Sequence, residues 1–306
     1  MTFTELRYLV ALAREKHFRR AAESCNVSQP TLSVAVKKAE DFLGVPLFER
    51  APGDVRLTPS GEKICAQAEK VLFEMLRLKE LAESGKGQLA GPLRLGVIYT
   101  VAPYLLPRLV PAMHSAAPDI ALYLQENFTH NLASLLKSGE LDAAIVAAPF
   151  DESGIVTRPL YDEDFCVAIP AGHPLCRETE ISQAALDSRQ LLILGQGNCF
   201  RDQVVAACPQ LAKPGSLKEA MESSSLETLR YMVASGAGVA VVPATAAALW
   251  PKETPKESLM AIRPFVPPAP FRRVALAWRV TFPRTKAMEA LYQAIRQFLP
   301  EGARAC

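Results

Sequence analysis

The chain has 306 residues, 49% of them hydrophobic, which is enough for two or more domains with ordinary hydrophobic cores. Its formal net charge is only +2, so the overall charge does not indicate nucleic-acid binding, and any contact with DNA must come from local placement of basic side chains. The 7 cysteines are odd in number and irregularly spaced, which favours a reducing compartment over a disulfide framework.

We expect no targeting signal at the beginning of the chain. Residues 1–7 lack the charged and apolar regions of a signal peptide, and no apolar run approaches the length of a membrane span, so we expect a cytoplasmic protein. The 4 histidines are scattered, and no pair of C-x-x-C elements suggests zinc. We therefore expect no metal and no cofactor.

Residues 1–57 predict a small helical unit that binds DNA. Apolar stripes at helical spacing include Leu6 and Phe18, and Ser28 is placed to cap a third helix whose first turn tolerates Pro30. Two helices joined by a tight turn, with small polar residues opening the second, are typical of a helix-turn-helix whose recognition helix enters the major groove. The alternative is a small helical domain with solvated polar faces.

Candidate DNA contacts lie on this recognition helix and on a hairpin that follows it. The two short segments that flank residues 51–54 predict a β-hairpin, the wing. Small polar residues at the start of the helix suit base edges, whereas basic residues suit phosphates. The candidates are Gln29, Pro30, Thr31 and Ser33 at the start of the helix, and Lys37, Arg50 and Arg56 for phosphates.

Residues 58–86 predict one long helix, with Thr58 as its cap and Pro59 as its first residue. Six apolar residues step by alternating fours and threes, which is the a/d seam of a coiled coil. These residues are Ile64, Ala68, Val71, Met75, Leu78 and Ala82. So short a seam does not fold alone, so we expect it to pack against a second copy and to set the spacing of two DNA-binding units. Residues 87–92 are then interpreted as a hinge.

From residue 93 onward strands and helices alternate, which predicts an α/β domain with a parallel sheet. We expect one lobe from residues 93–163 and 269–306, and a second lobe from residues 164–268. A cleft between two such lobes is where small ligands bind. Thr100 and Thr129 both follow first-lobe strands, so their hydroxyls either face this cleft or act as plain helix caps.

Two cysteines lie in a short predicted helix that follows an apolar strand. Asn198 is a natural N-cap, so Cys199 falls in the first turn, where the helix dipole lowers the pKa of a thiol, with Arg201 as a second contributor. Cys208 is expected to face inward. In a helix the two Cα atoms would be about 13 Å apart, whereas a disulfide needs roughly 4.4 to 6.8 Å. Bonding would require this helix to unfold, the basis of a two-state switch; the alternative is two buried cysteines acting as small hydrophobes.

Over its whole length the chain resembles the LysR-type transcriptional regulators, which combine a winged helix-turn-helix, a linker helix and a two-lobed domain like the periplasmic binding proteins. The matching segments are Ala21–Ala22, Val27–Ser33, Leu43–Arg50 and Leu57–Gly61. Within that family the chain is similar to the peroxide-sensing members. That second resemblance is carried by Thr100–Pro107, Cys199–Gln203 with Cys208, Ser225–Arg230 and Met232–Ala234.

The resemblance implies a role for each of these site residues. Cys199 would be the peroxidatic cysteine and Cys208 the resolving one. Thr100, Thr129 and Asp202 would help to position hydrogen peroxide, with Asn198 and Arg201 beside them. Asn198 departs from the pattern, because the familiar sensors carry histidine there; asparagine can form hydrogen bonds but cannot assist proton transfer.

The same resemblance implies partners: promoter DNA of antioxidant genes, RNA polymerase, a cellular thiol reductant, and a homodimer that assembles to a homotetramer. Two other functions remain open. A regulator of this architecture could bind an organic effector between its lobes and keep both cysteines structural. A thiol peroxidase is the enzyme alternative, although it would not need the DNA-binding unit, and we expect a protein that is not an enzyme.

Overall fold

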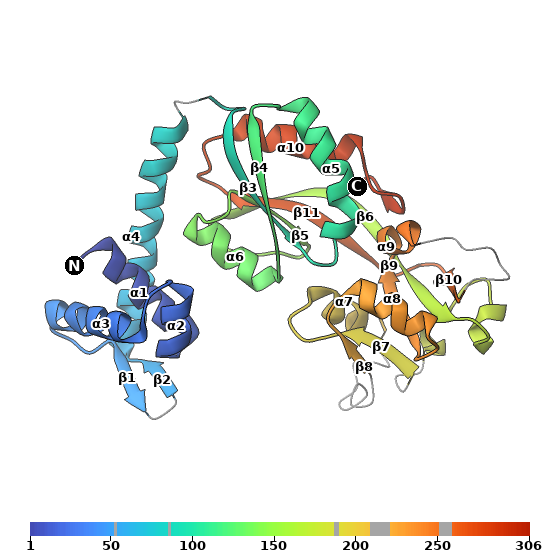
Figure 1. The fold of residues 1–306 in the computed structure, drawn as a ribbon, viewed down its shortest axis with the longest axis horizontal. Coiled ribbons are helices and arrows are strands. Elements are labelled where there is room, and N and C mark those ends of the chain that lie inside the picture. The colour runs from blue at the N-terminus through green and yellow to red at the C-terminus, as the bar shows by residue number, and fades with distance from the viewer. Residues whose placement is uncertain (52–53, 85–86, 187–189, 209–220, 251–258) are drawn as a thin grey trace. The chain divides into compact units, whose positions relative to one another are not determined.

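The computed structural model describes the chain except for residues 52–53, 85–86, 187–189, 209–220 and 251–258 (Figure 1). The side chains of residues 50, 51, 54, 76, 77 and 79–84 are also outside the description. The turn of the predicted wing at 52–53 and the predicted roles of the Arg50 and Ala82 side chains therefore lie outside the described residues. The chain forms two compact units, Met1–Glu83 and Ser84–Cys306, which are described in turn.

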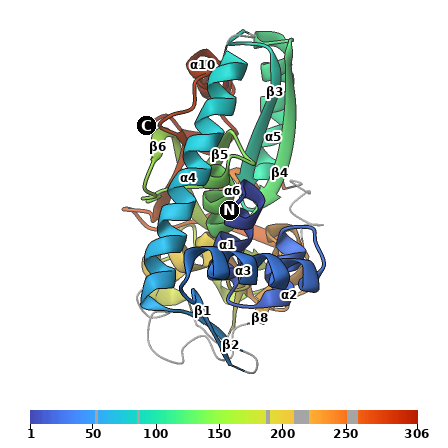
Figure 2. The ribbon, with the colours of Figure 1, turned by 90° about the vertical axis from the view of Figure 1, so that its left-hand side faces the viewer.

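The first unit consists of three short helices, a hairpin and one long helix (Figure 2). These elements are α1 Phe3–Glu15, α2 Phe18–Ser24, α3 Gln29–Leu43, β1 Phe48–Ala51, β2 Asp54–Leu57 and α4 Pro59–Ser84. The two predicted caps are confirmed: the Ser28 hydroxyl accepts a hydrogen bond from the Thr31 N–H (3.3 Å), and the Thr58 hydroxyl accepts one from the Gly61 N–H (2.9 Å). The strands β1 and β2 pair antiparallel, as expected for the wing.

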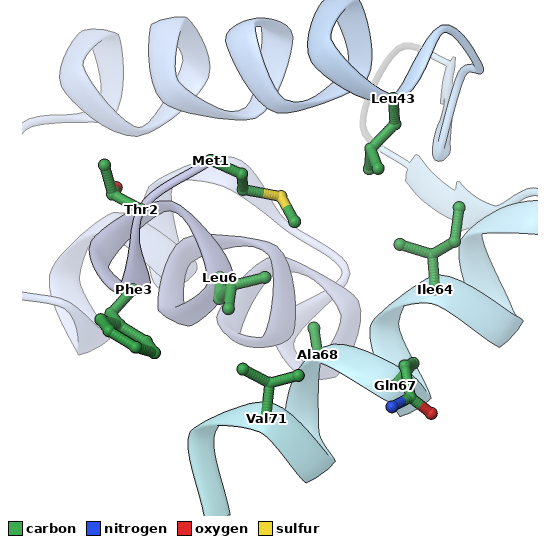
Figure 3. Close-up of a pocket in the computed structure, with 9 residues that line it drawn as sticks. All are labelled: Met1, Thr2, Phe3, Leu6, Leu43, Ile64, Gln67, Ala68 and Val71. Carbon is green, nitrogen blue, oxygen red and sulfur yellow. The ribbon is translucent and has the colours of Figure 1, made fainter. Parts of the chain in front are cut away.

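The apolar seam of α4 is only partly available to a second copy. Ala68 is only 3% exposed within the single chain, and the pairing of the seam with a second copy stays a prediction. Further along the helix, Met75 is 36% and Leu78 is 69% exposed. Beside this seam a groove of about 630 Å³ lies among α1, α3 and α4, and Figure 3 shows Leu43, Ile64 and other apolar side chains converging on it.

The second unit is built on one continuous ten-stranded arrangement. Its strands are β3 Gly91–Ile98, β4 Ile120–Asn127, β5 Ala143–Ala147, β6 Ile155–Pro170, β7 Leu191–Leu194, β8 Met221–Ser223, β9 Val239–Pro243, β10 Met260–Pro264, β11 Phe271–Arg279 and β12 Ala303–Arg304. Its α-helices are α5 Ala102–Ala116, α6 Thr129–Ser138, α7 Cys199–Ala207, α8 Leu226–Ala234, α9 Ala244–Leu249 and α10 Thr285–Gln297, with 3-10 turns at Pro174–Arg177 and Gln183–Ala185. The α/β class is confirmed.

The sheet is mixed, so the prediction of a parallel sheet is wrong in part. The order is β4-β3-β5-β11-β6-β9-β7-β8. Strand β3 is parallel to β4 and β5, and β7 is parallel to β8 and β9, but β11 and β6 run antiparallel to their neighbours. The returning strand β11 enters between β5 and β6, which the alternation of strands and helices did not predict. The first half of β6 pairs with β11 and its second half with β9 and β10, so this one strand links both halves of the sheet (Figure 1).

Two separate hydrophobic clusters form on this sheet. The first draws its buried residues from 93–161 and 274–295, and the second draws all but one of its own from 165–265. The exception is Tyr104, which belongs to α5 but is 4% exposed within the second cluster. This division agrees with two lobes, whose exact boundaries and the hinge at 87–92 stay predictions. Among the described residues, no helix combines the length and the apolar character needed to cross a bilayer.

Gly61 provides a test of how the wing is held against α4. A Cβ atom at this position would lie 2.1 Å from the Leu47 carbonyl oxygen, which is backbone and cannot turn away. We predict that Gly61→Ala lowers the free energy of unfolding of the first unit by about 1–3 kcal/mol, because overpacking forces the backbone to shift. Urea unfolding followed by circular dichroism measures this. The exposed neighbour provides the control: Ser60→Ala should change stability by less than about 0.5 kcal/mol. Equal stability of the two variants would contradict the close contact.

Candidate functional site

Helix α7 begins where the sequence predicts, but its cap differs. The chain turns at Gly197 (φ +92°), where an added Cβ would touch the Phe128 ring at 3.6 Å, and Asn198 occupies the N-cap position. The Asn198 side chain does not cap the helix, because its amide donates instead to the Gly195 carbonyl (3.1 Å). The predicted side-chain cap is therefore wrong, and Asn198 braces the loop that leads into Cys199.

The two cysteines of this segment lie at opposite ends of α7 and in different surroundings. Cys199 is the first helical residue, half-buried, and packs against the first hydrophobic cluster. Cys208 follows the last turn, is 0% exposed and belongs to the second cluster, which confirms that it faces inward. Both are free thiols. With the helix intact their Cα atoms are about 13 Å apart, roughly twice the span of a disulfide.

Burial acts strongly on the Cys208 thiol. Desolvation raises its pKa from the ordinary 9.0 to about 11, so the thiol stays neutral in the folded protein near neutral pH. Cys199 sits instead at the positive end of the helix dipole, a place that favours an anion. The two sulfurs thus differ both in exposure and in the charge that their surroundings favour.

The Arg201 side chain bonds to residues of two neighbouring strands. Its guanidinium donates to the Leu194 carbonyl (2.9 Å) and to the Glu222 carboxylate (2.5 Å). These bonds fasten the first turn of α7 to strands β7 and β8. Arg201 thus forms an ion pair with Glu222, a residue of β8 that lies 21 residues away in the sequence, and its assistance to the Cys199 thiolate stays a prediction.

A buried ion pair, whose two residues both lie in the predicted first lobe, contacts Thr245 and Phe200 of the predicted second lobe. Arg272 of β11, 2% exposed, donates through Nε to Glu163 of β6 (2.6 Å), which is 0% exposed. The other two nitrogens donate to the Thr100 hydroxyl (2.8 Å) and the Thr100 carbonyl (2.9 Å). Thr245 of α9 donates to the second Glu163 oxygen. The Arg272 guanidinium also lies 4.9 Å from the ring centroid of Phe200, the residue after Cys199.

The two threonines of the predicted cleft differ in their hydrogen bonding, and neither caps a helix. Thr100 is 4% exposed and is held by Arg272 as described. Thr129 is the first residue of α6, and its buried hydroxyl has no hydrogen-bond partner. It directly follows Phe128, whose ring touches Gly197 near the start of α7. Asp202 is exposed in the first turn of α7.

A second link between the lobes involves Tyr104. Its hydroxyl donates to the Glu227 carboxylate of α8 (3.1 Å), which also accepts from the Trp250 indole (3.1 Å) and from Arg230 (3.3 Å). Burial and the nearby Glu227 carboxylate raise the pKa of Tyr104 well above its ordinary value, so it remains a hydrogen-bond donor. Sequence reasoning missed this contact, although Tyr104 lies inside a segment that carries the family resemblance.

The predicted DNA-contacting residues lie on α3 and on the hairpin of the first unit. Gln29, Pro30, Thr31 and Lys37 are exposed, Ser33 is half-buried, and Arg56 is exposed on β2. The Thr31 hydroxyl lies 2.7 Å from that of Ser28, so it already shares a hydrogen bond. The side chain of Arg50 lies outside the described part of the chain.

The burial of Cys208 predicts a slow reaction with alkylating agents. Since its pKa is raised to about 11, its thiolate fraction at about pH 8 falls roughly hundredfold below that of an ordinary thiol. We expect iodoacetamide to modify Cys208 at least about a hundredfold more slowly in the reduced native chain than in concentrated urea. Peptide mass spectrometry of timed samples measures both rates.

The exposed Cys306 supplies the internal control for this experiment. Its rate should change little between native buffer and urea, because it lies in solvent in both. If Cys208 reacted in the native chain as fast as Cys306, its thiol would not be enclosed by the second cluster.

Two protein families match the chain in the order of its two units. The family described as "Bacterial regulatory helix-turn-helix protein, lysR family" matches residues 3–62. The family described as "LysR substrate binding domain" matches residues 86–300. Together the two matches cover most of the chain.

Similar proteins extend over the full length of the chain. The DNA-binding transcriptional dual regulator OxyR of Escherichia coli is 40% identical over 296 residues, which is 97% of this chain and 95% of that protein. The structure of full-length OxyR from Pseudomonas aeruginosa, a cysteine-to-aspartate variant, is 52% identical with a TM-score of 0.68, and covers 99% of this chain and 100% of that one. A peroxide-bound cysteine-to-serine mutant of Corynebacterium glutamicum OxyR is 32% identical with a TM-score of 0.63, and covers 97% of this chain and 92% of that one. The chain belongs to the LysR family of bacterial transcriptional regulators.

Proposed function

We propose that this chain is a DNA-binding transcriptional regulator that senses hydrogen peroxide through Cys199 and Cys208 and controls antioxidant genes. One observation carries the proposal: the two free thiols sit at opposite ends of α7 and in different hydrophobic clusters. A disulfide between them requires the helix to unfold, so oxidation necessarily changes the surface of the second lobe. The names of the similar OxyR proteins support the same signal.

The chemistry takes place in two balanced steps. The Cys199 thiolate attacks one oxygen of hydrogen peroxide; the S–O bond forms as the O–O bond breaks, which leaves a sulfenic acid and hydroxide, protonated to water. The Cys208 sulfur then attacks the Cys199 sulfur, forming the S–S bond and releasing the sulfenic oxygen as a second water. Peroxide is reduced to two waters, and the two thiols are oxidised to one disulfide. A cellular thiol reductant restores the thiols by exchange.

We assign the positioning of peroxide to three side chains: Thr129, Thr100 and Asp202. The buried Thr129 hydroxyl has no partner in the chain, so it is available to a small polar molecule. Thr100 presents a hydroxyl oxygen whose orientation Arg272 fixes at 2.8 Å. Asp202 is an exposed acceptor in the same turn as Cys199. Asn198 supports them indirectly, by holding the loop through Gly195.

Contacts to promoter DNA come from the first unit. We assign base contacts to Gln29, Pro30, Thr31 and Ser33, at the start of the recognition helix α3. Lys37, Arg50 and Arg56 are assigned to phosphates. Such a regulator acts on RNA polymerase at the promoter, in the cytoplasm where the DNA lies.

The oligomer that fits this function is a homodimer that assembles to a homotetramer. The exposed seam residues Met75 and Leu78, with the groove beside α1, offer one apolar surface to a second copy. A second surface lies in the other unit, where Leu106 and Val110 of α5 line a shallow pocket and the edge strand β4 exposes Tyr123. Two different surfaces are what a dimer of dimers needs.

Replacing the reactive cysteine tests the switch. We expect Cys199→Ser to fold normally but to abolish the change that peroxide causes in a footprint on the DNA upstream of the protein's own gene. Cys208→Ser should retain one oxidation step and accumulate a sulfenic acid on Cys199, detectable with dimedone. Counting free thiols in the unsubstituted chain should show that peroxide removes Cys199 and Cys208 from the 7 thiols.

Cys306→Ser is the matched control, because this exposed cysteine at the end of the chain has no part in the proposed chemistry. Its footprint should respond to peroxide like that of the unsubstituted chain. A peroxide response that persists in Cys199→Ser would refute the assignment of the sensor, and unchanged free thiols after peroxide would favour an organic effector instead.

A charge in the apolar seam of α4 tests the proposed assembly. Leu78 is 69% exposed, and Leu78→Glu would place a carboxylate in a desolvated contact between copies. Since the second surface remains, the assembly should fall from four copies to two in sedimentation equilibrium, and affinity for a two-site duplex should drop at least about tenfold. The exposed Lys70 lies off the seam, so Lys70→Glu should leave the mass unchanged. An unaltered mass for Leu78→Glu would exclude the seam as a contact.

A further inference from the structure

The recognition helix α3 carries an exposed apolar side chain that no step so far has used. Val34 is 56% exposed, although valine is a poor helix former and more than half of its surface remains in solvent at this position. Leu32 and Val36, two residues before and after it, are both 0% exposed. At about 100° per residue Val34 points about 160° away from each of them. It therefore lies at the centre of the surface that α3 turns away from its own core.

The neighbours of Val34 on that surface define what the surface can meet. Residues three and four positions away lie beside it on a helix. They are Pro30, Thr31, Lys37 and Lys38, all exposed. The two lysines suit phosphates, and the apolar Val34 suits an apolar group. A groove of DNA offers both, and the small side chains toward the start of the helix allow a close approach to it. In the major groove of DNA that apolar group is the C5 methyl of thymine.

We propose that Val34 specifies thymine by apolar contact with its C5 methyl group. The inference rests on the proposed function in one respect, the entry of α3 into the major groove. The inference adds Val34 to the proposed base-contacting residues, as one that would distinguish thymine from other bases by apolar contact and not by a hydrogen bond. Lys37 and Lys38 flank the contact and neutralise phosphates, so they supply affinity that does not depend on sequence.

The test uses the reduced full-length chain and a duplex selected by it from a random-sequence pool. Each thymine of the selected duplex is replaced in turn by deoxyuridine, which lacks only the C5 methyl. At one position of each half-site we expect the dissociation constant to rise about fourfold, the effect of uncovering one methyl-sized group. In Val34→Ala the thymine and deoxyuridine duplexes should bind equally.

Two controls separate this contact from general effects. Lys37→Gln should weaken binding to both duplexes alike and leave their ratio unchanged, since a phosphate contact carries no sequence information. Phe42→Ala removes the other strongly exposed apolar side chain of α3, 68% exposed near its end, and should also preserve the ratio. Val34→Ala should fold, because alanine is the better helix former. Val34→Thr, which keeps one methyl, should show a reduced but measurable ratio.

The other possible results of the deoxyuridine experiment also test the contact of Val34 with thymine. A selected duplex with no position sensitive to deoxyuridine overturns the proposal, and so does a sensitivity that persists in Val34→Ala. If selection returned no duplex at all, DNA binding itself would fail, a result distinct from binding without methyl discrimination.

Discussion

The proposed switch in the second unit depends on the length of one short helix. With α7 intact, the Cα atoms of Cys199 and Cys208 are about 13 Å apart, and the two cysteines belong to different hydrophobic clusters. Isolated helices of this length are marginal in water, so α7 owes its stability to packing and not to propensity. The buried side chains that hold it are Phe200 and Val204. The helix is thus stable while Phe200 and Val204 stay buried, but its own helix propensity contributes little to that stability.

The ion pair of Arg272 and Glu163 explains how events at α7 reach both lobes. It lies on β11 and β6, the two central antiparallel strands, and it touches Thr100 on one side and Phe200 on the other. Removing one partner of such a buried pair costs about 3–5 kcal/mol, because the other charge stays desolvated. In the proposed switch we therefore expect the pair to stay intact when α7 unfolds. In the fold described here, the Arg272 guanidinium lies against the Phe200 ring and so helps to hold α7 in place.

The sequence predicted features that local chemistry determines. Ser28 and Thr58 cap their helices because a cap needs only a hydroxyl and the next turn. The side-chain cap at Asn198 was wrong because the Asn198 amide donates to the nearby Gly195 carbonyl, and the ion pair of Arg201 with Glu222, 21 residues away, was not predicted. No local pattern could have revealed the partnership of Arg272 and Glu163, which are 109 residues apart. The roles of Cys199 and Cys208 stay predictions, drawn from their spacing, the expected helix start and the family resemblance. The mixed sheet follows from β11, a strand late in the chain, inserting beside β5.

The same packing that holds α7 bears on how the proposed switch resets. To reach Cys199, Cys208 has to leave a cluster in which it is 0% exposed, and the unfolded segment uncovers Phe200 or Val204 as well. Each such side chain contributes about 1.5–3 kcal/mol to the reduced fold. This free energy opposes the disulfide and raises its reduction potential, since about 1.4 kcal/mol corresponds to about 30 mV for a two-electron couple. A bond weakened in this way is one that a cellular thiol can reduce, so the burial of Cys208 makes the signal reversible as well as conditional on oxidation.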